Sequence, residues 1–271
     1  MSAQKTILFL TNLKNGAEEE DLFLIERLKQ DMRVIVAHPL ECRPFLHQVD
    51  GVVIRNAWPT HAYKDAWLKL IDTFHQENIR TYNPMSGSGD THGKFYLAEL
   101  YSNSFPVIPS VLSIQDINRL PTSPFYWTKP IWGCDGSGAA KKTKQQLIEQ
   151  PSQDIVIQPF VEFTEEPCFY FIDNEFACGI TTTHRLDDEN ITSYYPTGEE
   201  IALAQDFVKW NKLPYGIQRI DFVRLKTGEL LLTEIEDNCP YLYLFDLPEK
   251  ERLIITEKLV KSIRFNLGLG D

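Results

Sequence analysis

The sequence predicts an α/β (α+β) protein in which a small parallel sheet precedes a larger, strand-rich region. Two observations predict this order. Apolar strand-like runs alternate with amphipathic helices through residues 1–84, which is typical of a parallel sheet with crossover helices. Further along, residues 219–238 read RIDFVRLKTGELLLTEIEDN, and the two apolar runs around a KTGE turn have the pattern of a β-hairpin.

The first region is expected to contain four strands and two helices. The strands are residues 5–12, 33–38, 50–58 and 79–84, and the helices are residues 18–31 and 64–78. In the second helix, Trp67, Leu68, Ile71 and Phe74 recur near one face at the helical period. No GxGxxG follows the first strand, so a dinucleotide site is not expected there.

A Gly/Ser-rich stretch, MSGSGDTHG at residues 85–93, is expected to be a linker and the domain boundary. The second region then alternates apolar strands with amphipathic helices. The expected strands are 124–131, 154–163, 168–183 and the hairpin, and the expected helices are 94–104, 110–120, 201–212 and 248–268.

The composition limits the partners of the protein. A net charge of −11 argues against non-specific nucleic-acid binding, because phosphate contacts require clustered Lys and Arg. Only residues 129–144, KPIWGCDGSGAAKKTK, are locally basic, which favours a small anionic ligand. The five cysteines have no metal-ligand spacing, and the apolar run ILFL is too short for a signal peptide or a membrane span. A cytoplasmic location is therefore expected.

The basic stretch combines a lysine with a glycine-rich loop. Lys129 ends an apolar strand, and Gly133, Gly136 and Gly138 follow within six residues. Such a loop can turn backbone N–H groups toward phosphate oxygens while the lysine adds positive charge. A plain turn is the competing interpretation, and the GK[ST] of a P-loop is absent. The acidic segment that ends the next apolar run, 154–163, is more simply a solvent-facing turn.

Three carboxylates interrupt the apolar pattern of the hairpin. Glu234 and Glu236 share one face of their strand, and Asp221 lies on the other strand. Two carboxylates about 4 Å apart repel by roughly 4 kcal/mol at an effective dielectric near 20, so a compensating positive charge is expected. A convergent set of this kind suits Mg²⁺. The alternative is the solvated face of an edge hairpin, but that alternative does not explain the glycine-rich loop and its lysine.

A lysine, a glycine-rich loop, an apolar hinge and three carboxylates are together the parts needed to hold a magnesium nucleotide. In this order they resemble the ATP-grasp superfamily of carboxylate ligases, over most of the chain. The resemblance implies an ATP-grasp fold with a Rossmann-like pre-ATP-grasp domain at residues 1–84 and an ATP-grasp domain at 85–271. Within the second domain it implies a small lid subdomain at 105–160 and a large Mg²⁺-binding subdomain at 161–271.

Individual residues match the motifs of this family. Lys94 precedes the FPVIPS segment and Lys129 lies in TKP, so the resemblance assigns both lysines to ATP. It assigns further nucleotide contacts to the lid loop, the hinge and the following strand: Gly133, Gly136, Ser137, Gly138, Gln158, Phe160, Val161 and Glu166. In RIDFV it places Arg219 at the transferred phosphoryl group, where Arg219 and Lys129 are the expected catalytic residues. Asp221, Glu234 and Glu236 are the implied Mg²⁺ ligands.

The sequence also departs from the family pattern. Ser104 stands where glycine is usual, and Pro167 stands where arginine usually follows the acid at Glu166. The usual ending E-x-N is replaced by Glu234-x-Glu236, and Asn238 is two residues too far along to substitute directly.

Two short motifs most resemble the branch that includes the O-ureido-serine cyclo-ligase and other proteins with a glutathione-synthetase-like ATP-binding domain. Arg55 and Trp58 match the R-x-x-W of this branch, and an Asn-Pro pair follows at Asn83. Arg55 is a candidate for orienting a substrate carboxylate, with a surface ion pair as the alternative. Arg185, after the strand GITTT, is a second candidate for contact with the substrate.

The resemblance implies an ATP- and Mg²⁺-dependent ligase that joins a small carboxylate to an amine or similar nucleophile through an acylphosphate. Two alternatives stay open. One is a nucleotide-binding scaffold without catalysis, and the other is a phosphotransferase that stops at the phosphorylated product. The helix at residues 63–78 is a candidate surface for a homodimer.

Overall fold

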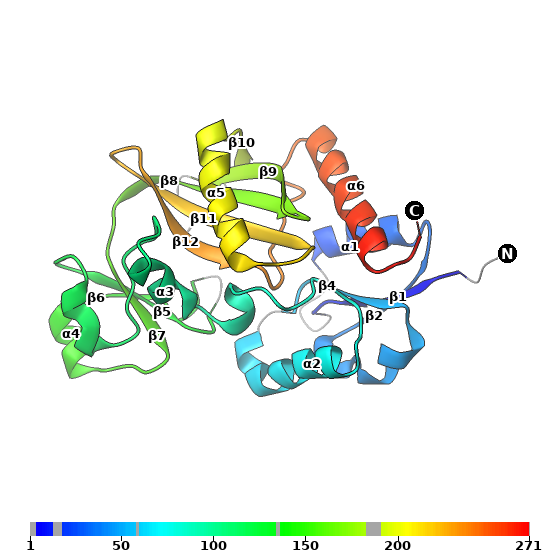
Figure 1. Ribbon diagram of the computed structural model, residues 1–271, viewed down its shortest axis with the longest axis horizontal. Coiled ribbons are helices and arrows are strands. Elements are labelled where there is room, and N and C mark those ends of the chain that lie inside the picture. The colour runs from blue at the N-terminus through cyan, green and yellow to red at the C-terminus, as the bar shows by residue number, and fades with distance from the viewer. Residues whose placement is uncertain (1–3, 13–17, 58–59, 134–135, 183–190, 271) are drawn as a thin grey trace.

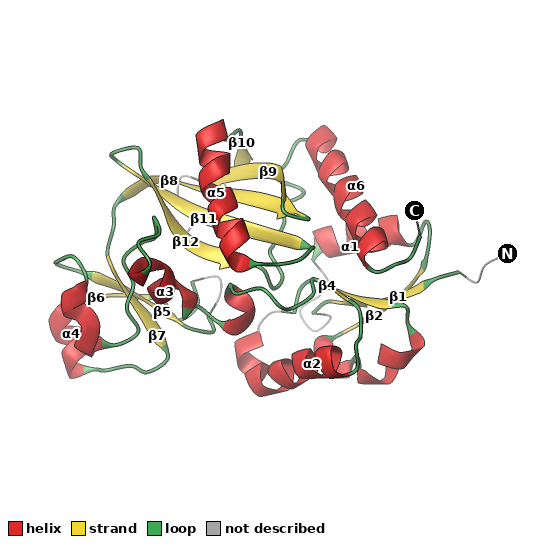
Figure 2. Cartoon of the chain, in the orientation of Figure 1, coloured by secondary structure: helices red, strands yellow, loops and turns green. Residues whose placement is uncertain are grey.

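The computed structural model describes residues 4–12, 18–57, 60–133, 136–182 and 191–270. Within these ranges the chain forms three separate sheets of four, five and three strands (Figure 1). Figure 2 shows the helices placed around them. In the same ranges, no helix combines the length and the apolar character that a membrane crossing requires.

The first sheet is parallel, with the strand order β2-β1-β3-β4. Its elements are β1 Thr6–Leu10, α1 Glu19–Leu28, β2 Arg33–Ala37, β3 Gly51–Ile54, α2 Lys64–Gln76 and β4 Thr81–Tyr82. Four short 3-10 helices accompany the first region: Pro39–Glu41, Arg43–Gln48, Thr60–Tyr63 and Asp90–His92. In α2, Trp67, Ile71 and Phe74 are buried on the predicted face. The predicted parallel sheet is confirmed.

The predicted linker, residues 85–93, is packed against the second region rather than open. Asp237 accepts hydrogen bonds from the N–H groups of Gly89 (3.0 Å) and Thr91 (2.8 Å) and from the Thr91 hydroxyl (2.9 Å). A Cβ atom at Gly87 would overlap the Asp237 carboxylate, so only glycine fits there. One buried carboxylate therefore fixes this crossing in place, and the domain boundary expected here stays a prediction.

The three-stranded sheet is antiparallel, with the order β6-β5-β7. After α3 Tyr96–Ser102 and the 3-10 helix Ile114–Arg119, its elements are β5 Tyr126–Pro130, β6 Ala140–Lys142, α4 Lys144–Glu149 and β7 Ile155–Pro159. The sequence prediction lacks β6 and α4. β6 is mostly lysine, and α4 is only six residues long and begins with a capping box at Thr143, so neither has an apolar period.

The five-stranded sheet is antiparallel, with the order β10-β9-β8-β11-β12. Its strands are β8 Phe163–Ile172, β9 Glu175–Thr182, β10 Thr192–Tyr194, β11 Ile217–Leu225 and β12 Leu230–Glu236. The run 168–183 turns back at Asp173 and Asn174, which both have positive φ, and so forms two strands rather than one. The predicted hairpin is confirmed as β11 and β12.

Two helices flank the five-stranded sheet (Figure 1). α5 Gly198–Asn211 covers one face, where Phe207 packs against Phe222 of β11. α6 Glu249–Asn266 lies beside α1, and its Leu259 shares a core with Ile7 of β1 and Tyr170 of β8. The last helix of the chain therefore joins the first sheet to the face of the large sheet opposite α5.

Candidate functional site

A β-bulge shapes the acidic hairpin. Asp221 pairs with Glu234, whereas the neighbouring Phe222 pairs with Leu232, so Thr233 is an additional residue in β12. As a result Leu232 lies in the core beneath α5, while Glu234 lies on the opposite face. The sequence predicted a shared face for the acids, but not the bulge that separates them from the apolar face.

The three carboxylates of the hairpin converge. One oxygen atom from each of Asp221, Glu234 and Glu236 lies within 4.8 Å of the others. Asp221 and Glu234 are buried, and Glu236 is half-buried. Carboxylate oxygens are the ligands that Mg²⁺ prefers, so this donor set fits the predicted metal.

Arg219 lies within this carboxylate cluster and is only 4% exposed. Its Nε and Nη2 donate to the two carboxylate oxygens of Asp221, at 2.8 and 2.9 Å, and Nη2 also donates to Glu236. Its Nη1 donates to the backbone carbonyl of Tyr241 at 3.1 Å. The bidentate pair fixes the plane of the guanidinium, as is typical of arginines that recognise planar anions.

Lys94 enters the cluster from the segment before α3. Its Nζ contacts Asp90 at 2.7 Å and also forms an ion pair with Glu234. The backbone N–H of Lys94 donates to the carbonyl of Ile131, just after β5, at 3.0 Å. Lys94 therefore lies between the hairpin and the three-stranded sheet.

The cluster carries more negative than positive side chains. Asp90 and the three hairpin acids contact two cations, Lys94 and Arg219. Burial raises the pKa of Glu236 to about 8, against the opposing effect of Arg219. Burial likewise raises the pKa of Asp90 to about 6, although Lys94 acts in the other direction. The cluster therefore favours additional positive charge.

Lys129 approaches the same place from the three-stranded sheet. Its Nζ donates to the carbonyl of Thr233, the bulged residue, at 3.4 Å. Because Trp127 pairs with Gln158 in the antiparallel register and Lys129 is two residues further along β5, all three side chains share one face. The structure thus brings the second predicted lysine to β12.

The hinge residues at the end of β7 have partners in the protein. Gln158 is buried, and its Nε2 donates to Ser110 Oγ at 2.9 Å. The N–H of Phe160 donates to a backbone carbonyl at 2.9 Å, and Lys141 Nζ lies 3.7 Å above the centre of its ring. The nucleotide contacts predicted for these two residues and for Val161 stay predictions.

The glycine-rich loop forms the turn between β5 and β6. Gly136 and Gly138 have φ values of 67° and 74°, and a Cβ atom at Gly138 would lie 2.9 Å from Pro130. Ser137 and both glycines are exposed, whereas Gly133 is half-buried. The geometry of the turn explains the glycines in part, and a phosphate contact stays a prediction.

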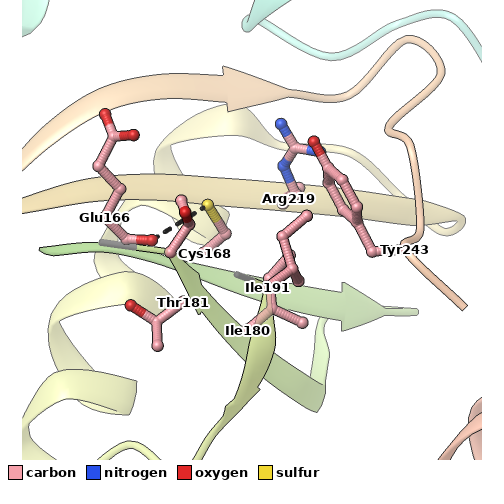
Figure 3. A pocket seen from close by; sticks show the side chains of 8 residues that line it. Glu166, Cys168, Ile180, Thr181, Ile191, Arg219 and Tyr243 are labelled. Carbon is pink, nitrogen blue, oxygen red and sulfur yellow. Dashed lines mark hydrogen bonds between the residues drawn. The ribbon is translucent and has the colours of Figure 1, made fainter. Parts of the chain in front are cut away.

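A small cavity lies beside Arg219 on the sheet face opposite α5. It is lined by Glu166, Cys168, Ile180, Thr181, Thr182, Ile191, Arg219 and Tyr243. Figure 3 shows Arg219 and Tyr243 side by side at one end and Glu166 at the other, with Cys168 and Ile180 between them. Glu166, which is predicted to contact the nucleotide, therefore lines the same cavity as Arg219.

Arg55 does not lie in this site. It is 3% exposed, and its guanidinium donates to Glu20 (2.8 Å), Asp21 (3.3 Å) and the carbonyl of Pro240 (3.0 Å). The alternative of a surface ion pair is wrong because the pair is buried. The guanidinium is also engaged by α1 and the loop after β12, rather than presented to a substrate. Trp58 and Arg185 are outside the described residues.

Sequence reasoning missed three contributors to the site. Asp90 lies four residues before Lys94, which is the spacing of helical ion pairs and a usable signal. Asp237 directly follows the E-x-E motif in the sequence, but nothing in the sequence indicates that it holds the segment next to Asp90. The Tyr241 carbonyl has no side-chain signal at all.

The chain was compared with known proteins. No protein-family model and no curated protein sequence matches it. Among solved structures, it resembles the D-cycloserine synthetase DcsG at 18% identity and a TM-score of 0.75, over 94% of this chain and 99% of that one. The D-alanine–D-alanine ligase of Bacillus anthracis in complex with ATP has 14% identity and a TM-score of 0.66, over 98% and 100%. The ATP-grasp ligase PsnB, in complex with a phosphomimetic precursor variant, Mg and ADP, has 15% sequence identity and a TM-score of 0.66. The match covers 98% of this chain and 99% of that one.

Proposed function

We propose that this chain, which has the predicted ATP-grasp fold, is an ATP-dependent ligase that joins a carboxylate to an amine. One observation supports this proposal above all. Lys94, Lys129 and Arg219 come from three different segments of the chain and meet at one hairpin, where Lys94 and Arg219 pair with its carboxylates and Lys129 donates to the carbonyl of Thr233. Such an arrangement suits a triphosphate whose negative charge is shared between metal ions and basic side chains.

Each charged group has a distinct role in this proposal. Asp221, Glu234 and Glu236 would hold Mg²⁺, which supplies positive charge to the phosphates when bound. Lys94 and Lys129 bind oxygen atoms of ATP. Arg219, whose guanidinium is oriented by Asp221 and which lines the cavity, stabilises the phosphoryl group during transfer.

The proposed reaction has two steps. A substrate carboxylate oxygen attacks the γ-phosphorus of ATP, the bond between that phosphorus and the β,γ-bridging oxygen breaks, and ADP leaves. The amine nitrogen then attacks the acyl carbon of the acylphosphate, the carbon–oxygen bond breaks, phosphate leaves, and the nitrogen loses a proton. The protein contributes positioning and charge stabilisation rather than a covalent intermediate.

The remaining predicted residues complete the nucleotide site in this proposal. The glycine-rich turn covers the phosphates, the segment at Phe160 and Val161 borders the base, and Glu166 reaches the nucleotide from the end of the cavity opposite Arg219. The Gln158 amide keeps Ser110 in place beneath this surface, since its hydrogen bond is made within the protein.

The test is ADP release from MgATP across a panel of amino acids and amines. We expect ADP to appear only with a matching carboxylate and amine. Asp221→Asn and Lys129→Ala should lower its release by about a hundredfold or more while circular dichroism stays unchanged. Glu257→Gln, an exposed acid on α6 that pairs with Arg27, is the matched control and should retain full turnover.

Two outcomes would replace this proposal with an alternative. Tight MgATP binding with no ADP release for any pair of substrates would indicate a nucleotide-binding scaffold. A stable phosphorylated substrate that accumulates in the presence of the amine would indicate a phosphotransferase.

A further inference from the structure

The loop after β12 is held at three consecutive backbone groups. The carbonyl of Pro240 accepts from Arg55 Nη1 at 3.0 Å, and the N–H of Leu242 donates to the carboxylate of Glu20 at 3.0 and 3.1 Å. Between them, the carbonyl of Tyr241 accepts from Arg219 Nη1 at 3.1 Å. The same carbonyl accepts from the Tyr170 hydroxyl at 2.7 Å.

The two outer contacts come from the first region of the chain, whereas the middle contact belongs to the carboxylate cluster. Glu20 lies in the first turn of α1, and Arg55 directly follows β3. The two side chains form a buried ion pair of 2.8 Å. A continuous set of hydrogen bonds therefore runs from the first sheet, through three residues of backbone, to the guanidinium of Arg219.

We propose that Arg55 and Glu20 are a positioning pair for Arg219. They fix the peptide groups of residues 240–242, and the Tyr241 carbonyl in turn fixes the side of the guanidinium that the carboxylates do not hold. This inference rests on the proposed function, in which Arg219 stabilises the transferred phosphoryl group.

The carbonyl contact is the one neutral hydrogen bond that Arg219 makes among its described partners. Its other partners, Asp221 and Glu236, are assigned to the metal. A guanidinium without the Tyr241 carbonyl would be oriented by the metal ligands alone. The same loop carries Tyr243, whose ring lies 5.8 Å from Arg219 Cζ and lines the cavity (Figure 3). Loss of the Arg55–Glu20 pair should therefore displace both the Arg219 guanidinium and the Tyr243 ring at one end of the cavity.

The experiment compares four variants in steady-state kinetics. Arg55→Met removes the contact to Pro240, Arg55→Lys keeps the charge, and Glu20→Gln keeps an oxygen acceptor for Leu242. Arg27→Met is the matched control. It breaks a different arginine–glutamate pair, Arg27 with Glu257, which joins α1 to α6 and does not contact the loop.

We expect Arg55→Met to lower kcat by about ten- to a hundredfold, the size of effect that a small misplacement near the reacting atoms produces. KM for ATP should stay within about twofold of the wild-type value, since Lys94 and Lys129 are unchanged. A misaligned Arg219 loses contacts in the transition state and therefore lowers kcat. Arg55→Lys and Glu20→Gln should have intermediate kcat values, and Arg27→Met should match the wild type.

Amide hydrogen exchange provides a readout that does not depend on turnover. Exchange in a peptide covering residues 240–244 should rise in Arg55→Met and Glu20→Gln and stay at the wild-type rate in Arg27→Met. An unchanged kcat, or a protected loop in Arg55→Met, would overturn the positioning role. Wild-type protein that releases no ADP with any substrate would instead overturn the proposed function, and the exchange result would still decide whether the pair fixes the loop.

Discussion

The protein contains two buried clusters of arginine and carboxylates that look alike and differ in composition. In the first, Arg55 joins Glu20 and Asp21 near the edge between α1 and the loop after β12. In the second, Arg219 joins Asp221 and Glu236 on the large sheet. Both arginines are almost completely buried.

The difference lies in what else each cluster contains. In the first cluster, neutral donors complete the contacts, since Glu20 accepts from a backbone N–H and Asp21 accepts from the Thr11 hydroxyl at 2.6 Å. The second cluster contains two further carboxylates, Glu234 and Asp90, together with Lys94, and Lys129 approaches it from the three-stranded sheet. The convergence of three carboxylate oxygens within 4.8 Å of one another, rather than a buried arginine, therefore distinguishes the second cluster from the first.

The largest effect that separates the clusters is expected for Asp221→Asn. Turnover should fall by about 10²- to 10³-fold, the usual result of removing one preorganised charged contact. Without Mg²⁺, the free energy of unfolding should fall by less than the loss of an isolated buried ion-pair partner would cost, because relief of the repulsion among the acids partly offsets the lost bidentate contact with Arg219. Substrate-dependent ADP release and urea unfolding measure the two quantities. A clear loss of stability together with normal turnover would make the second cluster structural like the first.

The next effect is a pH dependence that belongs to the first cluster. Burial raises the pKa of Glu20 from 4.5 to about 7. The folded state therefore holds this proton more tightly than the unfolded state, so the stabilisation is present below pH 4.5 and is lost as the pH rises toward 7. At about 1.4 kcal/mol for each pKa unit, the rise from 4.5 to about 7 limits this loss to roughly 3–4 kcal/mol. Glu20→Gln lacks this titration.

Urea unfolding of the wild type and of Glu20→Gln at pH 5 and pH 8 measures this pH-dependent contribution of Glu20 to stability. The difference in unfolding free energy should move in favour of the variant as the pH rises. A difference that is constant, or that moves toward the wild type, would show that Arg55 keeps Glu20 ionised throughout.

The third effect concerns ligand-induced stabilisation. MgATP at a hundredfold excess over its Kd should stabilise the folded protein by about 2.7 kcal/mol through mass action. Glu236→Gln should reduce this gain, because it removes a proposed metal ligand, whereas Asp21→Asn should retain it in full. Thermal unfolding with and without MgATP measures both gains, and equal gains in the two variants would remove Glu236 from the metal site.

The smallest effect is expected for Asp21→Asn itself. The amide retains one oxygen for Arg55 or Thr11, so the unfolding free energy should fall by only about 1–2 kcal/mol, the value of a lost hydrogen bond. Turnover of the folded enzyme should stay near that of the wild type. A loss of turnover as large as that of Asp221→Asn would erase the distinction between the clusters.

Much of this architecture was predictable because hydrophobic periodicity is strong in it. β1, β2 and β3 are short apolar runs, and α2 has a clear apolar stripe, so the parallel sheet followed from sequence. The hairpin followed from its turn and from two long apolar strands. The elements that were missed, β6, α4 and β10, are short and polar, and tertiary contacts rather than local pattern define them.

The site was predictable to the extent that its chemistry is carried by side chains in recognisable motifs. Lys94, Lys129, Arg219 and the three hairpin acids were all identified, and the structure brings them together. The burial of Arg55 was not predicted, because a motif does not show whether an arginine is buried among acids from another helix. The bulge at Thr233 was missed because no residue there demands it.

The anchoring of residues 85–93 by Asp237 affects how the molecule is able to move. A chain segment fixed by three hydrogen bonds and lacking room for a Cβ atom does not serve as a hinge. The first sheet and the five-stranded sheet, which α6 also joins, should therefore travel as one rigid body. If the proposed nucleotide binds, the three-stranded sheet is the part left to open and close around it. Labels placed on α4 and α5 should then report distance changes that labels on α2 and α5 do not.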